Sequence, residues 1–121
     1  MFHNQPVLYN QTRNILLAQR VVIADSFFTR LRGLMLRPSL PPGEALWLRP
    51  CNSIHTLFMR FPIDVVFLEE NNRVIKIIHN LQPWQISPLV RGGSSVLELA
   101  AGTLKNRASP GDQFYIGPAP R

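Results

Sequence analysis

Residues 51–68 read Cys-Asn-Ser-Ile-His-Thr-Leu-Phe-Met-Arg-Phe-Pro-Ile-Asp-Val-Val-Phe-Leu. The second part of this stretch, Ile63 to Leu68, is apolar at every position except Asp64. Such a run is typical of a strand that is buried on both faces. The first part mixes polar, potentially reactive side chains with large apolar ones. The stretch therefore predicts both the centre of the fold and its candidate site.

The chain that follows predicts a hairpin. Glu69-Glu70-Asn71-Asn72 has turn composition, because Asn tolerates left-handed backbone. Arg73 to His79 is rich in Val and Ile and predicts the returning strand. Alternation and turn residues elsewhere predict further strands over residues 14–23, 45–49, 89–91, 95–99 and 113–116. Residues 100–107 predict one or two helical turns.

One helix is expected in the N-terminal third. Asp25 or Ser26 can cap its N-terminus. Apolar residues then recur at the spacing of one helical face: Phe27, Leu31, Leu34 and Met35. The helix has to end before Pro38, because the residue preceding a proline disfavours helical backbone.

Length and composition bound the architecture. The chain has 121 residues, which suits one core, and its seven Gly and 11 Pro indicate many turns. We predict a mainly β fold: a small single-domain β-sandwich or partly open barrel of about six or seven short strands with one helix. The polar residues 1–13 are expected to form a flexible arm, and residues 14–121 a single β-rich domain.

Composition also excludes several classes of protein. The single Cys forbids an intrachain disulfide, and no apolar run approaches the roughly 20 residues of a membrane helix. The N-terminus lacks the basic and apolar regions of a signal peptide, so we expect a cytoplasmic protein. The net charge is +6, but the basic residues are spaced singly, and nucleic acid is an unlikely partner.

A metal site is one alternative. Cys51, His55 and Met59 are spaced by four residues and could be soft-metal ligands. On a helix such neighbours are roughly 5–6 Å apart, but on a strand they are about 13 Å apart and cannot share an ion. Pro50 and Pro62 favour extended backbone. We therefore expect no metal and no other cofactor.

A hydrolase-like enzyme is a second alternative. His55 could act with Asp64 or Glu98, and Cys51, Ser53 or Thr56 could supply a nucleophile. No Gly-x-Ser-x-Gly elbow is present to support this reading.

The favoured interpretation is a binding module with a polar site around His55–Asp64. Its ligand would be a small polar or anionic molecule or a segment of a partner protein. Asp64 interrupts an apolar strand and has to be hydrogen-bonded or paired, which predicts a scaffold role that ties down the neighbouring loop. The ligand-binding candidates are Ser53, His55, Thr56, Met59, Arg60, Asp64, Trp84, Arg91 and Glu98.

Four blocks between Ile15 and Ile116 resemble the domain-of-unknown-function 192 family of bacteria and archaea. These blocks are Arg32-Gly33-Leu34-Met35, His55-Thr56-x-x-Met59-Arg60-x-Pro62-Ile63-Asp64-Val65-x-Phe67-Leu68, Val96-Leu97-Glu98-Leu99-x-x-Gly102 and Pro110-Gly111-Asp112. The resemblance implies a compact β-rich domain. It supplies no established activity, cofactor or catalytic residue. Some members of the family are exported behind a leader.

Overall fold

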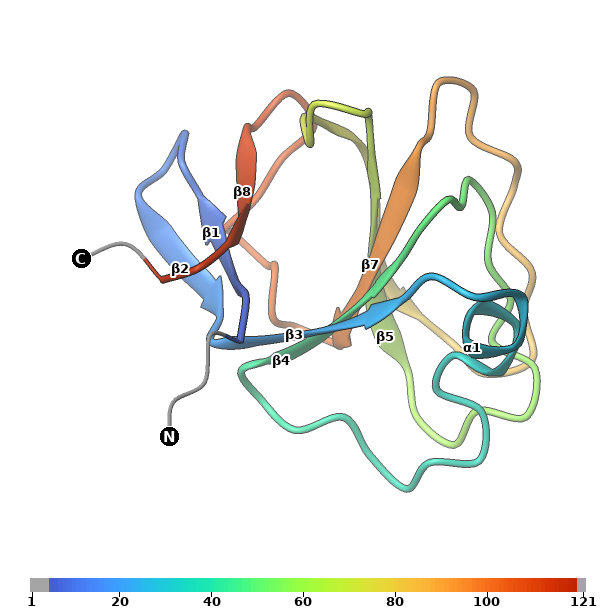
Figure 1. Cartoon of the computed structure of the whole chain (residues 1–121). Coiled ribbons are helices and arrows are strands. Elements are labelled where there is room, and N and C mark those ends of the chain that lie inside the picture. Colours follow the sequence, from blue (N-terminus) through green and yellow to red (C-terminus); the bar gives the residue numbers. More distant parts are fainter. Residues whose placement is uncertain (1–4, 120–121) are drawn as a thin grey trace.

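The computed structural model describes residues 5–119, which contain eight strands and one helix (Figure 1). The strands are β1 (Val7–Asn10), β2 (Ile15–Ala18), β3 (Arg20–Ala24), β4 (Glu44–Leu48), β5 (Ile63–Leu68), β6 (Val74–Leu81), β7 (Ser95–Ala100) and β8 (Phe114–Gly117). The helix α1 (Phe27–Arg32) lies between β3 and β4. The predicted mainly β class is confirmed.

The strands form two sheets. A three-stranded sheet has the order β2-β1-β8, and a five-stranded sheet has the order β3-β4-β7-β5-β6. Neighbouring strands are antiparallel except β3 and β4, which α1 and its loops connect in parallel. In Figure 1 the small sheet faces one side of the large sheet, and α1 lies on the other side.

Two corners join the sheets. At one corner the Val21 N–H donates to the carbonyl of Pro6 (2.9 Å). At the other, Arg73 and Gln113 form an isolated antiparallel bridge. Residues 5–119 therefore form a partly open barrel, without the continuous ladder that would close it.

The N-terminal strand corrects the predicted arm. Within residues 1–13, β1 is the central strand of the small sheet, with Val7 and Leu8 buried in the core. The polar Asn10 is also fully buried; its amide N–H groups donate to the carbonyl of Arg107 and to Asp112, while its Oδ1 has no hydrogen-bond partner among the described residues. Residues 1–4 lie outside the described residues.

The strand predicted over residues 14–23 divides at Gln19. The N–H groups of Gln19 and Arg20 both donate to the carbonyl of Gly43 (2.9 and 3.1 Å). This contact separates β2 and β3, so that each joins a different sheet. Two predicted elements do not form: residues 89–91 are a loop, and of the predicted helical residues 100–107, Ala100 ends β7 and residues 101–107 are consecutive turns.

The helix is shorter than predicted. Ser26 and Thr29 form a capping box at its N-terminus, and Gly33 ends it at φ 46° and ψ −122°. Leu34 of the predicted helical face is buried just beyond the helix, whereas no residue of α1 itself is buried. Within the part of the chain that the structure describes, no helix has the length and apolar character to cross a membrane.

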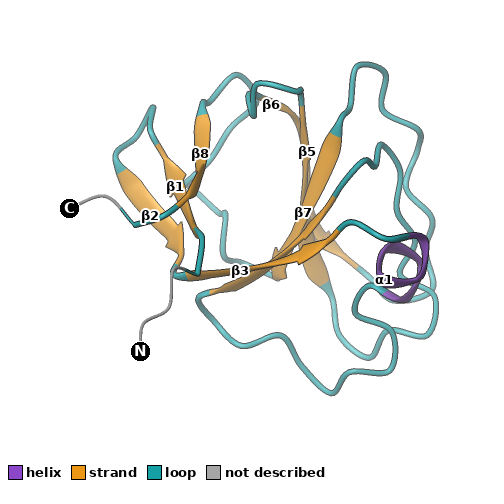
Figure 2. Cartoon of the chain, viewed as in Figure 1, coloured by secondary structure: helices purple, strands orange, loops and turns teal. Residues whose placement is uncertain are grey.

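The large sheet has an apolar layer on each face. The inner layer lies between the two sheets and includes Val66, Leu97 and Phe114. The outer layer includes Val65 and Phe67 and is covered by loops around α1 (Figure 2). All six residues of β5 are buried, which confirms the prediction of a strand covered on both faces, and the β5–β6 hairpin is also confirmed.

Candidate functional site

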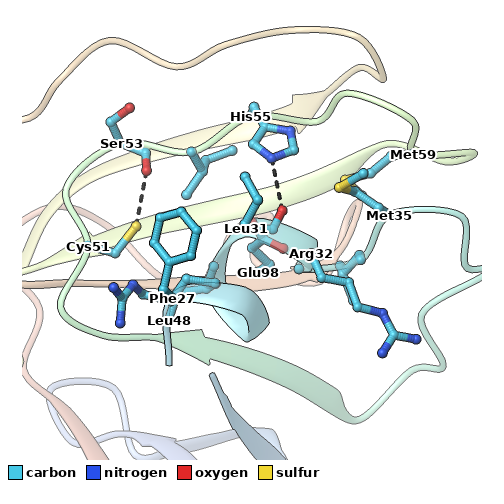
Figure 3. Close-up of a pocket in the computed structure, with 14 residues that line it drawn as sticks. Phe27, Leu31, Arg32, Met35, Leu48, Cys51, Ser53, His55, Met59 and Glu98 are labelled. Atoms are coloured by element: carbon cyan, nitrogen blue, oxygen red, sulfur yellow. Dashed lines mark hydrogen bonds between the residues drawn. The ribbon is translucent and has the colours of Figure 1, made fainter. Parts of the chain in front are cut away.

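A pocket of about 270 Å³ opens on the outer face of the large sheet (Figure 3). One wall is α1 with the turns that follow it, and the other is the loop 51–59. Leu48 of β4 and Glu98 of β7 also line it. The pocket exists because the β3–β4 connection brings α1 back over the sheet, opposite this loop.

Glu98 is the unusual residue of the pocket. It lies opposite Val65 in the β5–β7 ladder and shares the outer face of the sheet with it. The side chain is only 2% exposed, and its Oε1 atom has no hydrogen-bond partner among the described residues. Burial raises the pKa of Glu98 to about 8, so this carboxyl is largely protonated at neutral pH.

Gly33 lies within ordinary van der Waals range of this carboxyl. A Cβ atom placed on Gly33 would lie 3.8 Å from Oε1 of Glu98. The end of α1 therefore lies directly over the buried acid.

His55 is held by backbone groups at both ring nitrogens. Nδ1 accepts from the N–H of Leu57 (3.1 Å), so the ring proton lies on Nε2, which donates to the carbonyl of Leu31 (3.1 Å). Figure 3 shows this second bond linking the loop to α1. Because both nitrogens are engaged, His55 acts here as a tie between the two walls rather than as a free base.

Cys51 points into the same pocket. Its Sγ donates to the carbonyl of Ser53 (3.0 Å), and Ser53 also lines the pocket. Burial raises the pKa of the Cys51 thiol, so this residue is a poor nucleophile at neutral pH. Residues 5–119 contain no group of three or more His, Cys, Asp and Glu side chains that could hold a metal ion.

Asp64 lies away from this pocket. It is opposite Leu99 in the β5–β7 ladder, and Leu99 belongs to the inner layer. Its Oδ1 accepts from the N–H of Asn80 (2.9 Å) and its Oδ2 from the N–H of Leu104 (3.0 Å). The carboxylate ties β5 to β6 and to the turns after β7, which is the geometry of a scaffold residue.

Thr56 and Met59 have structural surroundings. The Thr56 hydroxyl donates to the carbonyl of Gln82 (2.7 Å) and accepts from the N–H of Gln85 (2.8 Å). Thr56 thus anchors the loop after β6 and does not line the pocket. Met59 is buried and contributes to the pocket wall.

The remaining candidates are exposed. Arg60 and Arg91 lie on loops outside the pocket lining. Trp84 packs on Phe58, with ring centroids 4.7 Å apart. The pocket therefore brings together Ser53, His55, Met59 and Glu98 from the predicted set.

Sequence reasoning missed the contribution of α1. Phe27, Arg30 and Leu31 line the pocket, but the helical periodicity indicated only that Phe27 and Leu31 share one face of the helix. Gly33 was the available signal, because a glycine at a helix end often marks a positive φ that turns the chain, here into the pocket wall.

A comparison of the sequence with protein families is decisive for classification. The model of the DUF192 family, described as "Uncharacterized ACR", matches residues 8–116. The chain belongs to the DUF192 family. The predicted resemblance is confirmed, and the matched range includes six of the eight strands in full and all but one residue each of β1 and β8.

Other DUF192 proteins and solved structures agree with this. A UPF0127 protein of Thermococcus sibiricus is 34% identical over 105 residues, which span 81% of this chain and 66% of the relative. A protein of unknown function from Novosphingobium aromaticivorans has a TM-score of 0.79 at 21% identity, and the match covers 92% of this chain and 83% of that protein. A Sinorhizobium meliloti protein has a TM-score of 0.76 at 24% identity, and the match covers 93% of this chain and 92% of that protein. These two structures show the fold.

Proposed function

We propose that this DUF192 domain binds a small ligand in the pocket beneath α1, and that the ligand carries an amine or amidinium group which pairs with Glu98. The observation that carries the proposal is the buried, unpartnered Oε1 atom of Glu98 at a pocket. A buried polar atom without a partner costs free energy, which a donor group on a ligand would recover.

The pocket walls indicate the rest of the ligand. Most of the lining is apolar, including Leu34, Leu48, Ile54 and Met59. The volume of about 270 Å³ lies just below the roughly 300–1,000 Å³ of pockets for drug-sized ligands. A short alkyl or single-ring amine fits this description better than a nucleotide or sugar.

Several features favour binding over hydrolysis. Both ring nitrogens of His55 are occupied, and the Cys51 sulfur is a thiol bonded to a carbonyl. Neither residue is poised as a base or nucleophile. Cys51, His55 and Met59 all line the pocket, but as metal ligands they are disfavoured, because the Cys51 thiol and both ring nitrogens of His55 are already bonded to backbone groups.

The test uses paired probes that differ in one group. Butylamine, benzylamine and benzamidine would be titrated by calorimetry and thermal shift, beside butanol and benzyl alcohol. We expect the amines or the amidine to bind and the alcohols to bind at least about tenfold more weakly, since they lack the charge. The affinity for the cation should rise about tenfold per pH unit up to about pH 8, because binding requires ionised Glu98.

Glu98→Gln supplies the matched variant. It keeps the shape of the side chain but cannot ionise, so amine binding should be lost. Asp64→Asn is the control, because that carboxylate lies on the other face of the sheet. If no amine or amidine stabilises the protein, or if Glu98→Gln binds them equally well, the proposal is wrong.

A further inference from the structure

The loop-covered end of the molecule has an unusual surface. The described residues expose ten large apolar side chains, and eight of them lie on α1 or on the segments 33–43, 49–62 and 82–93 around it. Soluble domains rarely gather exposed apolar side chains in this way unless the surface binds something.

The helix contributes three of these side chains. Phe27, Phe28 and Leu31 are all exposed, with Phe28 exposed to 78%, and no residue of α1 is buried. A helix normally turns its apolar stripe to the core. Here Phe27 and Leu31 line the open pocket and remain largely exposed, as does Phe28 beside them.

The loops contribute Leu36, Phe58, Trp84, Ile86 and Leu89. The first three adjoin one another, because the N–H of Leu36 donates to the carbonyl of Phe58 (2.9 Å) and the ring of Phe58 packs on Trp84. Ile86 forms an isolated bridge with His55, which connects this group to α1.

Backbone strain is concentrated at the same place. Seven described residues other than glycine have positive φ, and four of them are Asn, which tolerates that conformation. The other three are Leu36, Phe58 and Trp84, at φ 63°, 64° and 67°. For a large apolar residue, a positive φ costs on the order of 1 kcal/mol. The three residues that have this strained backbone are also ones whose apolar side chains are exposed to solvent.

Charge is equally one-sided. Residues 26–43, 49–62 and 82–93 contain six of the 11 Arg of the chain and none of its seven acidic residues. Arg32, Arg60 and Arg91 are exposed there, and no carboxylate lies within ion-pair distance of them among residues 5–119. The surface is therefore apolar, aromatic and mainly cationic, with the exposed Asp25 and the Arg37–Glu44 ion pair (3.5 Å) at its border.

We propose that this end of the molecule docks on an anionic lipid bilayer, with the apolar tips in the interface and the arginines at the headgroups. Aromatic and leucine side chains interleaved with basic ones are the composition of such surfaces. A bilayer accepts protruding side chains of any spacing, whereas a folded peptide partner requires a groove that matches it. Anionic lipid supplies the charge that the arginines lack.

The binding experiment uses vesicle flotation with two lipid mixtures. One is phosphatidylcholine alone, and the other contains about one third phosphatidylglycerol. We expect the protein to float with the anionic vesicles, to bind the neutral ones at least about tenfold more weakly, and to be partly released as NaCl rises from about 0.05 M to about 0.5 M. Trp84 emission should shift to the blue on binding. Trp84→Phe, which retains only the buried Trp47, should show no shift.

Matched variants distinguish vesicle binding through this surface from nonspecific adsorption of the protein to vesicles. Phe58→Ser should lower the vesicle partition coefficient about tenfold. Leu16→Ser is the matched control, because Leu16 lies on β2 and is exposed to 46%, nearly as much as Phe58 at 48%. It should change the partition coefficient less than about twofold. Arg60→Glu with Arg91→Glu should weaken binding far more than Lys76→Glu with Lys105→Glu, although the change in charge is the same. Urea unfolding of each variant reports whether it is folded.

Three outcomes would overturn the proposal. The first is failure of the folded wild-type protein to bind anionic vesicles. The second is equal binding of the Phe58 and Leu16 variants. The third is a dimer in solution that becomes a monomer in Phe58→Ser and does not bind vesicles, because a second copy of the chain would then cover the surface. Amine binding in the pocket does not enter any of these readouts.

Discussion

Asp64 of β5 and Glu98 of β7 lie on hydrogen-bonded neighbouring strands, yet their side chains occupy opposite faces of the large sheet. Glu98 is paired with Val65, and Asp64 with Leu99. Because side chains alternate along a strand, this offset of one position separates the two carboxyls. One becomes a fully hydrogen-bonded tie, and the other an unpartnered acid at a pocket.

Replacement of Asp64 should test the tie. Asp64→Asn replaces one acceptor by a donor that faces a backbone N–H, either of Asn80 or of Leu104. We expect a loss of about 1–3 kcal/mol in the free energy of unfolding, measured with urea at neutral pH. The same change at the exposed Glu70, as Glu70→Gln, should have almost no effect. Wild-type stability in Asp64→Asn would remove the scaffold role.

Glu98 should make stability depend on pH. Burial raises its pKa to about 8 in the folded protein, above the value of 4.5 expected for the unfolded chain. Between these values the folded state holds the extra proton, so its stability falls as pH rises, with a slope of at most about 1.4 kcal/mol per unit. Glu98→Gln lacks this titration. The variant should match wild type near about pH 4 and exceed it increasingly up to about pH 8. Parallel stability curves of the two proteins would contradict the burial of an unpartnered acid.

Gly33 should be required by its backbone conformation rather than by space. A Cβ atom there would make only ordinary contacts, the nearest at 3.7 Å from the carbonyl of Arg30, but φ 46° with ψ −122° is unfavourable for any other residue. We expect Gly33→Ala to lower the free energy of unfolding by about 1–3 kcal/mol. Arg32→Ala, at the exposed preceding position, should stay within about 0.5 kcal/mol of wild type. Equal stability of both variants would show that the turn relaxes.

Asp112 should stabilise the small sheet at neutral pH. Its Oδ2 accepts from the Asn10 amide (2.9 Å), Arg13 Nε (3.0 Å) and the N–H of Ser109 (3.0 Å). Burial alone would raise the pKa of Asp112, but these hydrogen bonds and the Arg13 charge together hold it below its usual value.

Asp112→Asn should therefore cost about 1–3 kcal/mol at pH 7. A carboxyl with a lowered pKa stabilises the protein above its unfolded value of 3.8, and this contribution is lost as pH falls through the folded pKa. The deficit of the variant, followed by urea unfolding, should shrink in the same acid range. A deficit that is independent of pH would mean that the charge plays no part.

Much of the fold could be predicted because local pattern and final burial agree. Ile63 to Leu68 is apolar enough to require cover on both faces, and the following Asn71-Asn72 turn specifies the hairpin. The scaffold role proposed for Asp64 likewise followed from one acid in an apolar strand, since such a group has to find donors. These features depend on neighbours in sequence, where the physical constraints are strongest.

Tertiary structure alone decided the rest. The polar N-terminal segment becomes the central strand β1 because β2 and β8, far apart in sequence, pair with both of its edges. The helical spacing of Phe27 and Leu31 could not reveal that α1 stands over a loop and exposes both residues. Register between β5 and β7 separates Asp64 from Glu98, and a shift of one residue between the two strands would have placed both carboxyls on the same face. Periodicity in a sequence defines the faces of an element, but only long-range pairing determines what each face meets.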